Sequence, residues 1–212
     1  MNIEQRPAHT GNYTAGRTAP IDRVVIHVAD GSYAGTLAWF ADPKCDTSAH
    51  YTIAADGRVG QSVNERATAW HSGDWAMNCR SVGIEHEGRQ NLTNPWQPSA
   101  SQLEASAQLV ADICRRWSIP VDRAHIIGHN EVNPDRAARK NCPGTGWPWA
   151  AFIERVRALT NADVPAHLPS VKDDRTLRLF NPETNLQIGT VTLIGGTDKA
   201  YIPPDVLASL RK

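Results

Sequence analysis

Three residues have the side chains that a catalytic metal site requires: His27, His129 and Cys142. A catalytic zinc ion is bound by three protein ligands and keeps a fourth position open, and two neutral imidazoles plus one thiolate meet that requirement. Because zinc and these ligands together keep about one unit of positive charge, the ion would remain a Lewis acid that lowers the pKa of water toward neutrality. The chemistry predicted by this combination is hydrolysis.

The sequence around each residue favours a site over simple packing. Taken singly, a buried histidine or cysteine is more often a packing residue than a ligand. His27, however, lies near the carboxyl end of residues 23–28, an apolar, β-branched run that predicts a buried strand. His129 directly follows a similar run at 124–128, and Cys142 stands before a Pro-Gly turn signal. Two strand ends and one tight loop can converge, so we expect the three side chains to meet.

Short blocks along the chain form a more specific pattern. They are, in order, Val25-Ile26-His27, Ser48-Ala49-His50-Tyr51 followed by Asp56-Gly57, Ala69-Trp70-His71-Ser72-Gly73, Ser81-Val82-Gly83-Ile84-Glu85, and Ile127-Gly128-His129 with Lys140-Asn141-Cys142-Pro143-Gly144. With these blocks the chain resembles the zinc-dependent N-acetylmuramoyl-L-alanine amidases, the family shared by phage endolysins, bacterial muropeptide amidases and peptidoglycan recognition proteins. The resemblance runs from about Arg23 to Trp149. Several blocks in the expected order are far more specific than any single histidine or cysteine.

The resemblance implies hydrolysis of the amide bond between the lactyl group of N-acetylmuramic acid and the first L-alanine of the stem peptide. It implies that His27, His129 and Cys142 hold zinc. It also implies that Glu85 acts on the attacking water and that Lys140 helps to stabilise the oxyanion. Both roles fit the chemistry, because the carbonyl gains negative charge as water adds and the leaving amine needs a proton. The alternatives are a surface carboxylate for Glu85 and a solvated loop cation for Lys140.

The chain also departs from patterns within the family. Some phage members use a tyrosine at the position of Ala49, so here the proton transfer is expected to rest on Glu85. The cytoplasmic muropeptide amidases have aspartate as third ligand, whereas this chain has Cys142, as the phage and animal branches do. The stretch from His129 to Cys142 is longer than in these relatives, which could displace Lys140.

Other residues in these blocks are predicted to bind substrate. Trp70 and His71 lie in a glycine-bounded segment, where an indole beside an imidazole suits a groove for sugar rings or a peptide stem. His50 and Asn78 could donate hydrogen bonds to the peptide backbone of the substrate. The alternative for Trp70 is a core aromatic residue.

The pattern of apolar residues predicts an α/β fold: a central mixed β-sheet flanked by helices, zinc at the strand ends, and a small β-rich C-terminal segment. The expected strands are at residues 24–28, 50–54, 59–63, 81–86 and 124–128, with an Asp56-Gly57 hairpin between the second and third. Helices are expected at 36–40, 101–117 and 148–160. The second of these would start with a capping box at Ser101 to Glu104.

The family resemblance and the change of composition after Asn161 together predict four parts. Residues 1–22 form an N-terminal extension, 23–161 the zinc amidase domain, 162–170 a linker and 171–212 a small β-rich element. The linker is rich in proline and polar residues, and the last part alternates as strands. Because about forty residues are marginal for independent folding, this element is expected to dock on the amidase domain, to mediate self-association, or to bind wall polymer.

Charge and hydropathy narrow the partners and the location. The formal net charge is zero, so nothing indicates a nucleic-acid partner. No apolar run approaches the roughly 20 residues of a membrane span, and the first residues lack a signal-peptide core. We therefore expect a protein made in the cytoplasm that acts on the cell wall, such as a phage product released at lysis, with a trimmed secreted form as the alternative.

The remaining cysteines have structural interpretations. Cys114 falls on the apolar face of the expected helix and is predicted to be a core residue. Cys45 and Cys79 lie in loops before strands that carry site residues. They could form a disulfide if the protein works outside the cytoplasm, or stay free thiols.

Together these features favour an enzyme, most simply a lytic amidase of the phage endolysin type that degrades peptidoglycan. The alternatives are an amidase that recycles soluble muropeptides and a recognition module that binds peptidoglycan without turnover. Members without activity typically lack a metal ligand, and this chain retains His27, His129, Cys142 and Glu85.

Overall fold

The structure, a computed structural model, describes residues 1–90, 93–132, 141–162, 176–180 and 187–192. The chain divides into two compact units, Met1–Thr160 and Asn161–Lys212. In the second unit, β9 (Thr176–Phe180) and β10 (Gln187–Thr192) pair as antiparallel strands.

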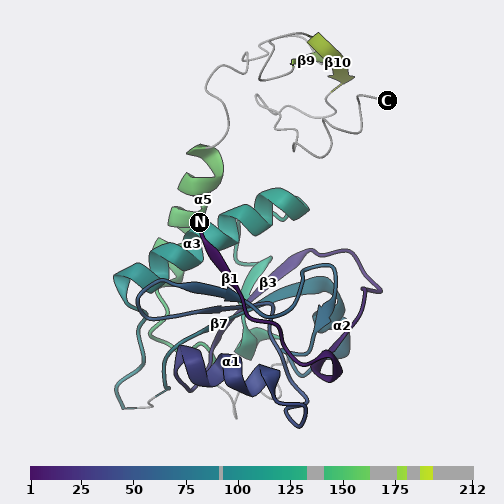
Figure 1. Cartoon of the computed structure of the whole chain (residues 1–212). Helices are drawn as coiled ribbons and strands as arrows, with labels where there is room; N and C mark the ends of the chain where they lie inside the picture. Colours follow the sequence, from purple (N-terminus) through teal and green to yellow (C-terminus); the bar gives the residue numbers. More distant parts are fainter. Residues whose placement is uncertain (91–92, 133–140, 163–175, 181–186, 193–212) are drawn as a thin grey trace. The chain divides into compact units, whose positions relative to one another are not determined.

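A six-stranded mixed sheet in the order β1-β5-β4-β7-β3-β8 forms the centre of the first unit (Figure 1). Its strands are β1 (Ile3–Gln5), β3 (Arg23–Val28), β4 (Tyr51–Ile53), β5 (Val59–Gln61), β7 (Ser81–His86) and β8 (Ile126–Gly128). The inner strand β3 is parallel to both neighbours, β7 and β8, while β5 runs antiparallel to β4 across the expected hairpin. Because β3 is covered on both faces, its apolar residues Val24 and Ile26 are fully buried.

Helices cover both faces of this sheet, as expected. Figure 1 shows α3 (Ala100–Trp117) and α5 (Trp149–Ala162) on one side and α1 (Tyr33–Ala41) on the other. The short helix α2 (Trp75–Arg80) precedes β7. The main core is built from β3, β4, β7 and β8 with the apolar residues of α3 and α5, among them the fully buried Phe152.

The start of α3 differs from the expectation. Ser99, not Ser101, caps the helix, because the Ser99 hydroxyl accepts a hydrogen bond from the Gln102 N–H at 3.1 Å. The same hydroxyl donates to the Ala55 carbonyl. This second bond ties the helix start to the β4–β5 hairpin, a tertiary contact that the local sequence does not reveal.

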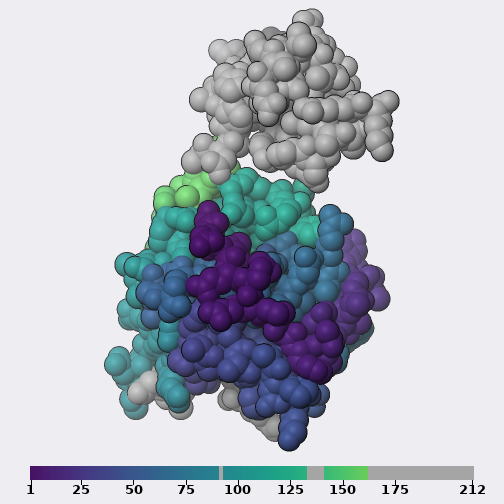
Figure 2. Space-filling view, viewed as in Figure 1, coloured from purple at the N-terminus to yellow at the C-terminus, as the bar shows by residue number. Residues whose placement is uncertain are grey.

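The expected N-terminal extension, residues 1–22, is part of the first unit. β1 forms the edge of the main sheet beside β5, and β2 (Tyr13–Thr14) pairs with β6 (Thr68–Ala69) after the 3₁₀ turn η1 (Thr10–Asn12). In Figure 2 these first residues, in purple, lie against the surface of the unit. The residues predicted as an N-terminal extension thus contribute strands to the first unit. Strands of two or three residues are too short to be recognised from an apolar periodicity in the sequence.

Arg17 shows how firmly this segment is integrated. Its guanidinium donates hydrogen bonds to the backbone carbonyls of Glu65, Asn78, Cys79 and Ser81. Burial lowers the pKa of Arg17 to about 10, so the group stays charged at neutral pH. The Arg17 side chain thus connects three places: the loop after β5, the end of α2 and the start of β7.

Cys45, Cys79, Cys114 and Cys142, all within the described residues, form no disulfide. The free-thiol alternative therefore holds for Cys45 and Cys79. Cys114 is buried in the main core on α3, as predicted. No helix in the described ranges combines the length and the apolar character that crossing a membrane requires.

Candidate metal centre and active site

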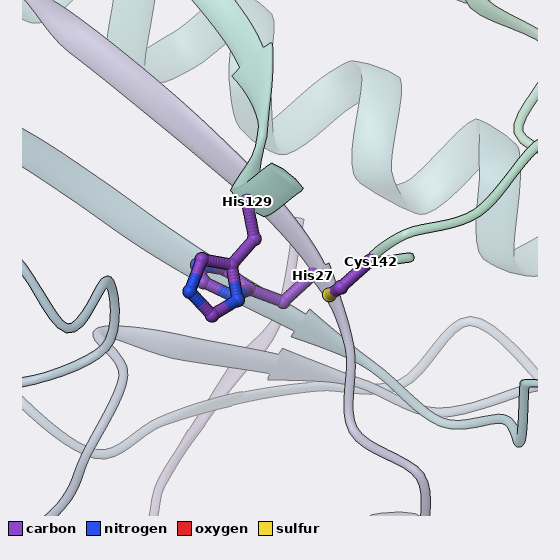
Figure 3. Close-up of side chains that lie close together, drawn as sticks. All are labelled: His27, His129 and Cys142. Carbon is purple, nitrogen blue, oxygen red and sulfur yellow. The ribbon is translucent and has the colours of Figure 1, made fainter. Parts of the chain in front are cut away.

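His27, His129 and Cys142 converge at the carboxyl edge of the sheet. His27 lies on β3, and His129 opens the 3₁₀ turn η2 (His129–Glu131) directly after β8. Since Ile26 pairs with Gly128 in register, the next residue on each parallel strand reaches the same level. Ligand atoms of the two histidines and Cys142 lie within 4.8 Å of one another (Figure 3). This is the convergence that the sequence predicts.

Backbone contacts hold Cys142 in this position. Its Sγ accepts a hydrogen bond from the Val28 N–H at 3.2 Å, which favours the thiolate. The Cys142 carbonyl accepts from the Asn130 N–H at 2.8 Å, so the loops of two candidate ligands are joined. Gly128 permits this close approach: a Cβ there would lie 2.9 Å from Cδ of Pro143.

The two histidines are oriented by one short segment. Nε2 of His27 lies 3.0 Å from Nδ1 of His71, and Nε2 of His129 lies 3.0 Å from the carbonyl oxygen of Ser72. A carbonyl can only accept, so His129 carries its proton on Nε2. Two imidazoles with fixed outer contacts and one thiolate form a donor set that can hold a metal ion.

Glu85 lies beside this cluster on the neighbouring strand. β7 pairs in register with β3, which sets Glu85 opposite His27. Its Oε1 lies 3.8 Å from Nδ1 of His27, and its side chain is 16% exposed. The side chain is thus partly exposed, although Oε2 is buried, and it lies adjacent to the candidate ligands, as a group acting on an attacking water must.

A groove of about 370 Å³ opens next to Glu85. Its walls include Thr36 and Trp39 from α1 and Thr47 from the loop that follows. Trp39 is 54% exposed although it is a large apolar residue. An open groove with an exposed indole, next to a carboxylate and three metal-ligand side chains, is suited to hold an extended substrate during hydrolysis.

Comparison with known proteins decides the family. Residues 17–145 match the N-acetylmuramoyl-L-alanine amidase family. The chain belongs to that family. N-acetylmuramoyl-L-alanine amidase A of Achromobacter lyticus is 33% identical over 167 residues, which cover 71% of this chain and 90% of that protein. The 1,6-anhydro-N-acetylmuramyl-L-alanine amidase AmpD of Escherichia coli is 32% identical over 138 residues, covering 58% and 69%.

A solved structure shows the same fold. A mutant endolysin from Bacillus subtilis aligns with a TM-score of 0.56 at 20% identity, over 74% of this chain and 99% of that chain. These results confirm the resemblance found in the sequence and the mixed α/β fold. As a member of the N-acetylmuramoyl-L-alanine amidase family, the protein is a hydrolase.

Within this amidase fold, two of the predicted substrate-binding residues have other partners. His50 is fully buried: its Nδ1 accepts from the Gly83 N–H at 3.0 Å, and its Nε2 lies 2.7 Å from Arg17. Burial, and next the charge of Arg17, lower its pKa to about 3. Asn78 is also buried, and its Oδ1 accepts from the N–H groups of His71 and Ser72. Both residues make these contacts within the protein interior, and the substrate role stays a prediction.

Trp70 and His71 are not among the residues that line the groove beside Glu85. The indole N–H of Trp70 donates to the Thr14 hydroxyl at 3.1 Å, which ties it to β2. His71 is 8% exposed and contacts the His27 ring. Burial, followed by the charges of His50, His129 and Arg17, lowers the pKa of His71 well below its usual value. Lys140, predicted to stabilise the oxyanion, lies outside the described residues.

Sequence reasoning missed Trp39 and the role of Ser81 behind His71. No local pattern separates an exposed tryptophan on α1 from any other surface aromatic residue. Gly83 did carry a signal, because an isolated glycine in a strand often marks a close approach. A Cβ on Gly83 would lie 2.4 Å from Cγ of His71.

Proposed function

We propose that this protein is a zinc-dependent amidase that degrades peptidoglycan by cleaving the bond between N-acetylmuramic acid and L-alanine. The observation that carries the proposal is the convergence of His27, His129 and Cys142 within 4.8 Å, next to Glu85 and its groove, in a member of the amidase family. The donor set fits zinc, because imidazole nitrogen and thiolate sulfur are the ligands that zinc prefers, and three of them leave one position open.

Zinc, when bound, supplies Lewis acidity, which polarises the amide carbonyl and makes water a better nucleophile at neutral pH. Glu85 takes a proton from the water while the water oxygen attacks the carbonyl carbon. The C–N bond then breaks, and Glu85 returns the proton to the departing amine of L-alanine. Lys140, from the sequence, is the proposed partner of the negative charge on the carbonyl oxygen.

The groove beside Glu85 is the proposed binding site that positions the substrate. Glu85 and the exposed Trp39 both line the groove. A sugar ring or an apolar stem residue packed on this indole would hold the scissile amide next to the carboxylate. The relatives support this substrate class: the AmpD protein of Escherichia coli is named for an N-acetylmuramyl-L-alanine bond.

Within this activity we propose a lytic role on the cell wall. The third candidate ligand supports a lytic role. The cytoplasmic muropeptide amidases, which recycle soluble fragments, have aspartate at the position where this chain has Cys142. The similarity to AmpD of Escherichia coli makes turnover of soluble muropeptides the second candidate.

One pair of substrates tests both candidates. The zinc content of the purified full chain is measured first, and the chain is then incubated with intact sacculi and, separately, with soluble anhydro-muropeptides. Release of stem peptides with a new amino-terminal alanine from sacculi is expected. Cleavage of the soluble fragments alone would establish the recycling candidate, and no zinc with no new amine from either substrate would overturn the proposal.

A further inference from the structure

A chain of buried hydrogen bonds runs from α2 to the candidate metal ligand His27. The Ser81 hydroxyl donates to the carbonyl of Met77 at 2.6 Å, and the same oxygen lies 3.1 Å from Nε2 of His71. Nδ1 of His71 lies 3.0 Å from Nε2 of His27. Ser81, His71 and His27 are 0%, 8% and 1% exposed. The side chains in this series of hydrogen bonds are therefore surrounded by protein groups.

The chemistry of the groups gives these hydrogen bonds one direction. A hydroxyl has a single proton and a carbonyl can only accept, so the proton of Ser81 lies on the bond to Met77. The Ser81 oxygen therefore accepts from Nε2–H of His71. A neutral imidazole has one N–H, which leaves Nδ1 of His71 as an acceptor for Nε2–H of His27. His27 then presents the lone pair of Nδ1, the nitrogen that lies 3.8 Å from Glu85 Oε1.

Ser72, the residue after His71, determines the tautomer of the second candidate ligand, His129. Nε2 of His129 faces the carbonyl of Ser72 at 3.0 Å, which also fixes the proton on Nε2. The backbone of this segment is held in turn, since Oδ1 of Asn78 accepts from the N–H groups of His71 and Ser72 at 3.2 and 2.9 Å. Gly83 leaves room for the His71 ring, because any Cβ there would clash with it.

We propose that His71 and Ser72, with Ser81 behind them, set the tautomer of both histidine ligands and so prepare the centre to bind metal. His71 is a positioning residue that acts through His27 and does not touch substrate. The inference rests on the metal-binding part of the proposed function. It goes beyond that part by assigning the ligand nitrogens and the groups that select them.

The protein offers a matched pair of serines for the test. Ser81→Ala removes the acceptor of His71, whereas Ser81→Thr keeps the hydroxyl. Ser106 is equally buried and lies 2.9 Å from Nε2 of His86, a histidine that contacts the backbone carbonyl of His27 at 2.8 Å and not its ring. Ser106→Ala therefore removes a similar buried serine–histidine bond without reaching the ligand nitrogen.

Two readouts are needed, both independent of hydrolysis. Nitrogen-15 spectra of the zinc-free full chain should show His27 protonated on Nε2 in the wild type, in Ser81→Thr and in Ser106→Ala, and a changed tautomer population in Ser81→Ala. Zinc affinity, from competition with a chelator, should fall about 10- to 100-fold in Ser81→Ala. It should stay within about twofold of wild type in the two other variants.

The outcomes separate this inference from the proposed function. A proton on Nδ1 of His27 in the wild-type chain, or unchanged zinc affinity in Ser81→Ala, would overturn the tautomer assignment. Equal losses of affinity in Ser81→Ala and Ser106→Ala would also overturn it, because they would indicate a general loss of packing. If the expected spectra and affinities are found but sacculi are not cleaved, the inference stands and the proposed function fails.

Discussion

The candidate ligand histidines His27 and His129 differ from the structural histidines His50 and His86 in what their ring nitrogens contact. In the interior, both ring nitrogens of His50 and of His86 have protein partners such as Gly83, Arg17 and Ser106. At the edge, Nε2 of His27 and of His129 is held by protein groups, while ligand atoms of both converge with the Cys142 sulfur. Burial does not distinguish a candidate ligand from a structural histidine, since His27 is as buried as His50. The distinction is that ligand atoms of His27 and His129 converge with a cysteine sulfur.

The largest effect should follow from removing the sulfur at this edge. Cys142→Ala leaves two ligands, which cannot keep a tetrahedral metal with one open position. Loss of bound zinc and a fall of activity on sacculi by about 10³-fold or more are expected. Elemental analysis and the release of stem peptides measure both.

Cys114→Ala is the interior control for that experiment. Cys114 is 2% exposed in the main core, so its loss should lower the free energy of unfolding by about 1–2 kcal/mol. Zinc content and rate should stay at wild-type levels. Full zinc loading and rate in Cys142→Ala would refute the ligand assignment.

The next largest effect is expected at Glu85. Glu85→Gln keeps the shape of the side chain and removes its proton affinity, so the rate should fall by about 10² to 10⁴ while zinc stays bound. Glu87→Gln is the matched control, because Glu87 lines a different cavity and its Oε2 accepts from the Ala55 N–H at 2.8 Å. A near-normal rate in Glu85→Gln would assign the proton transfer to another group.

His50 provides the interior test, through the pH dependence of stability. Its pKa is lowered to about 3 in the folded protein, against about 6.5 in an unfolded chain. Between these values the unfolded state binds more protons, so the free energy of unfolding falls as the pH drops below 6.5. From pH 6.5 to 5 this one histidine should cost about 2 kcal/mol.

Urea denaturation of the zinc-free chain across this pH range, in chelator, measures the effect. His50→Asn keeps an acceptor for the Gly83 N–H and cannot be protonated there. The variant should be less stable at pH 7, with a shallower fall of stability between pH 6.5 and 5. Equal slopes for the two chains would mean that His50 is not held neutral by the fold.

The sequence predicted this edge well because its chemistry follows from short, local patterns. His27 and His129 end apolar, β-branched runs, and parallel strands bring such ends together. The family blocks added Cys142 and Glu85, which the structure brings next to them. Lys140 stays a prediction, since it lies outside the described residues.

The interior could not be predicted in the same way, because its contacts join distant segments. His50 stands in a block resembling the family, yet its partner Arg17 belongs to the segment expected to be an extension. The role of Asn78 depends on the backbone of His71, and that of His71 on Ser81. The sequence within a few residues of His50, Asn78 and His71 does not indicate which atoms these side chains contact.

The smallest effect should come from the groove. Trp39 and Trp75 are both 54% exposed, but only Trp39 lines the groove beside Glu85, while Trp75 borders another cavity. Trp39→Ala should lower kcat/KM for soluble muropeptide by about fivefold, as expected for losing about 1 kcal/mol of aromatic packing. The change should appear mainly in KM, since the indole would contact the substrate equally before and during bond cleavage. Trp75→Ala should stay within about twofold of wild type, and both variants should keep their zinc.

Equal losses in the two variants would show that substrate binds elsewhere, and a fall in kcat alone would mean that Trp39 acts on the reacting groups and not on binding.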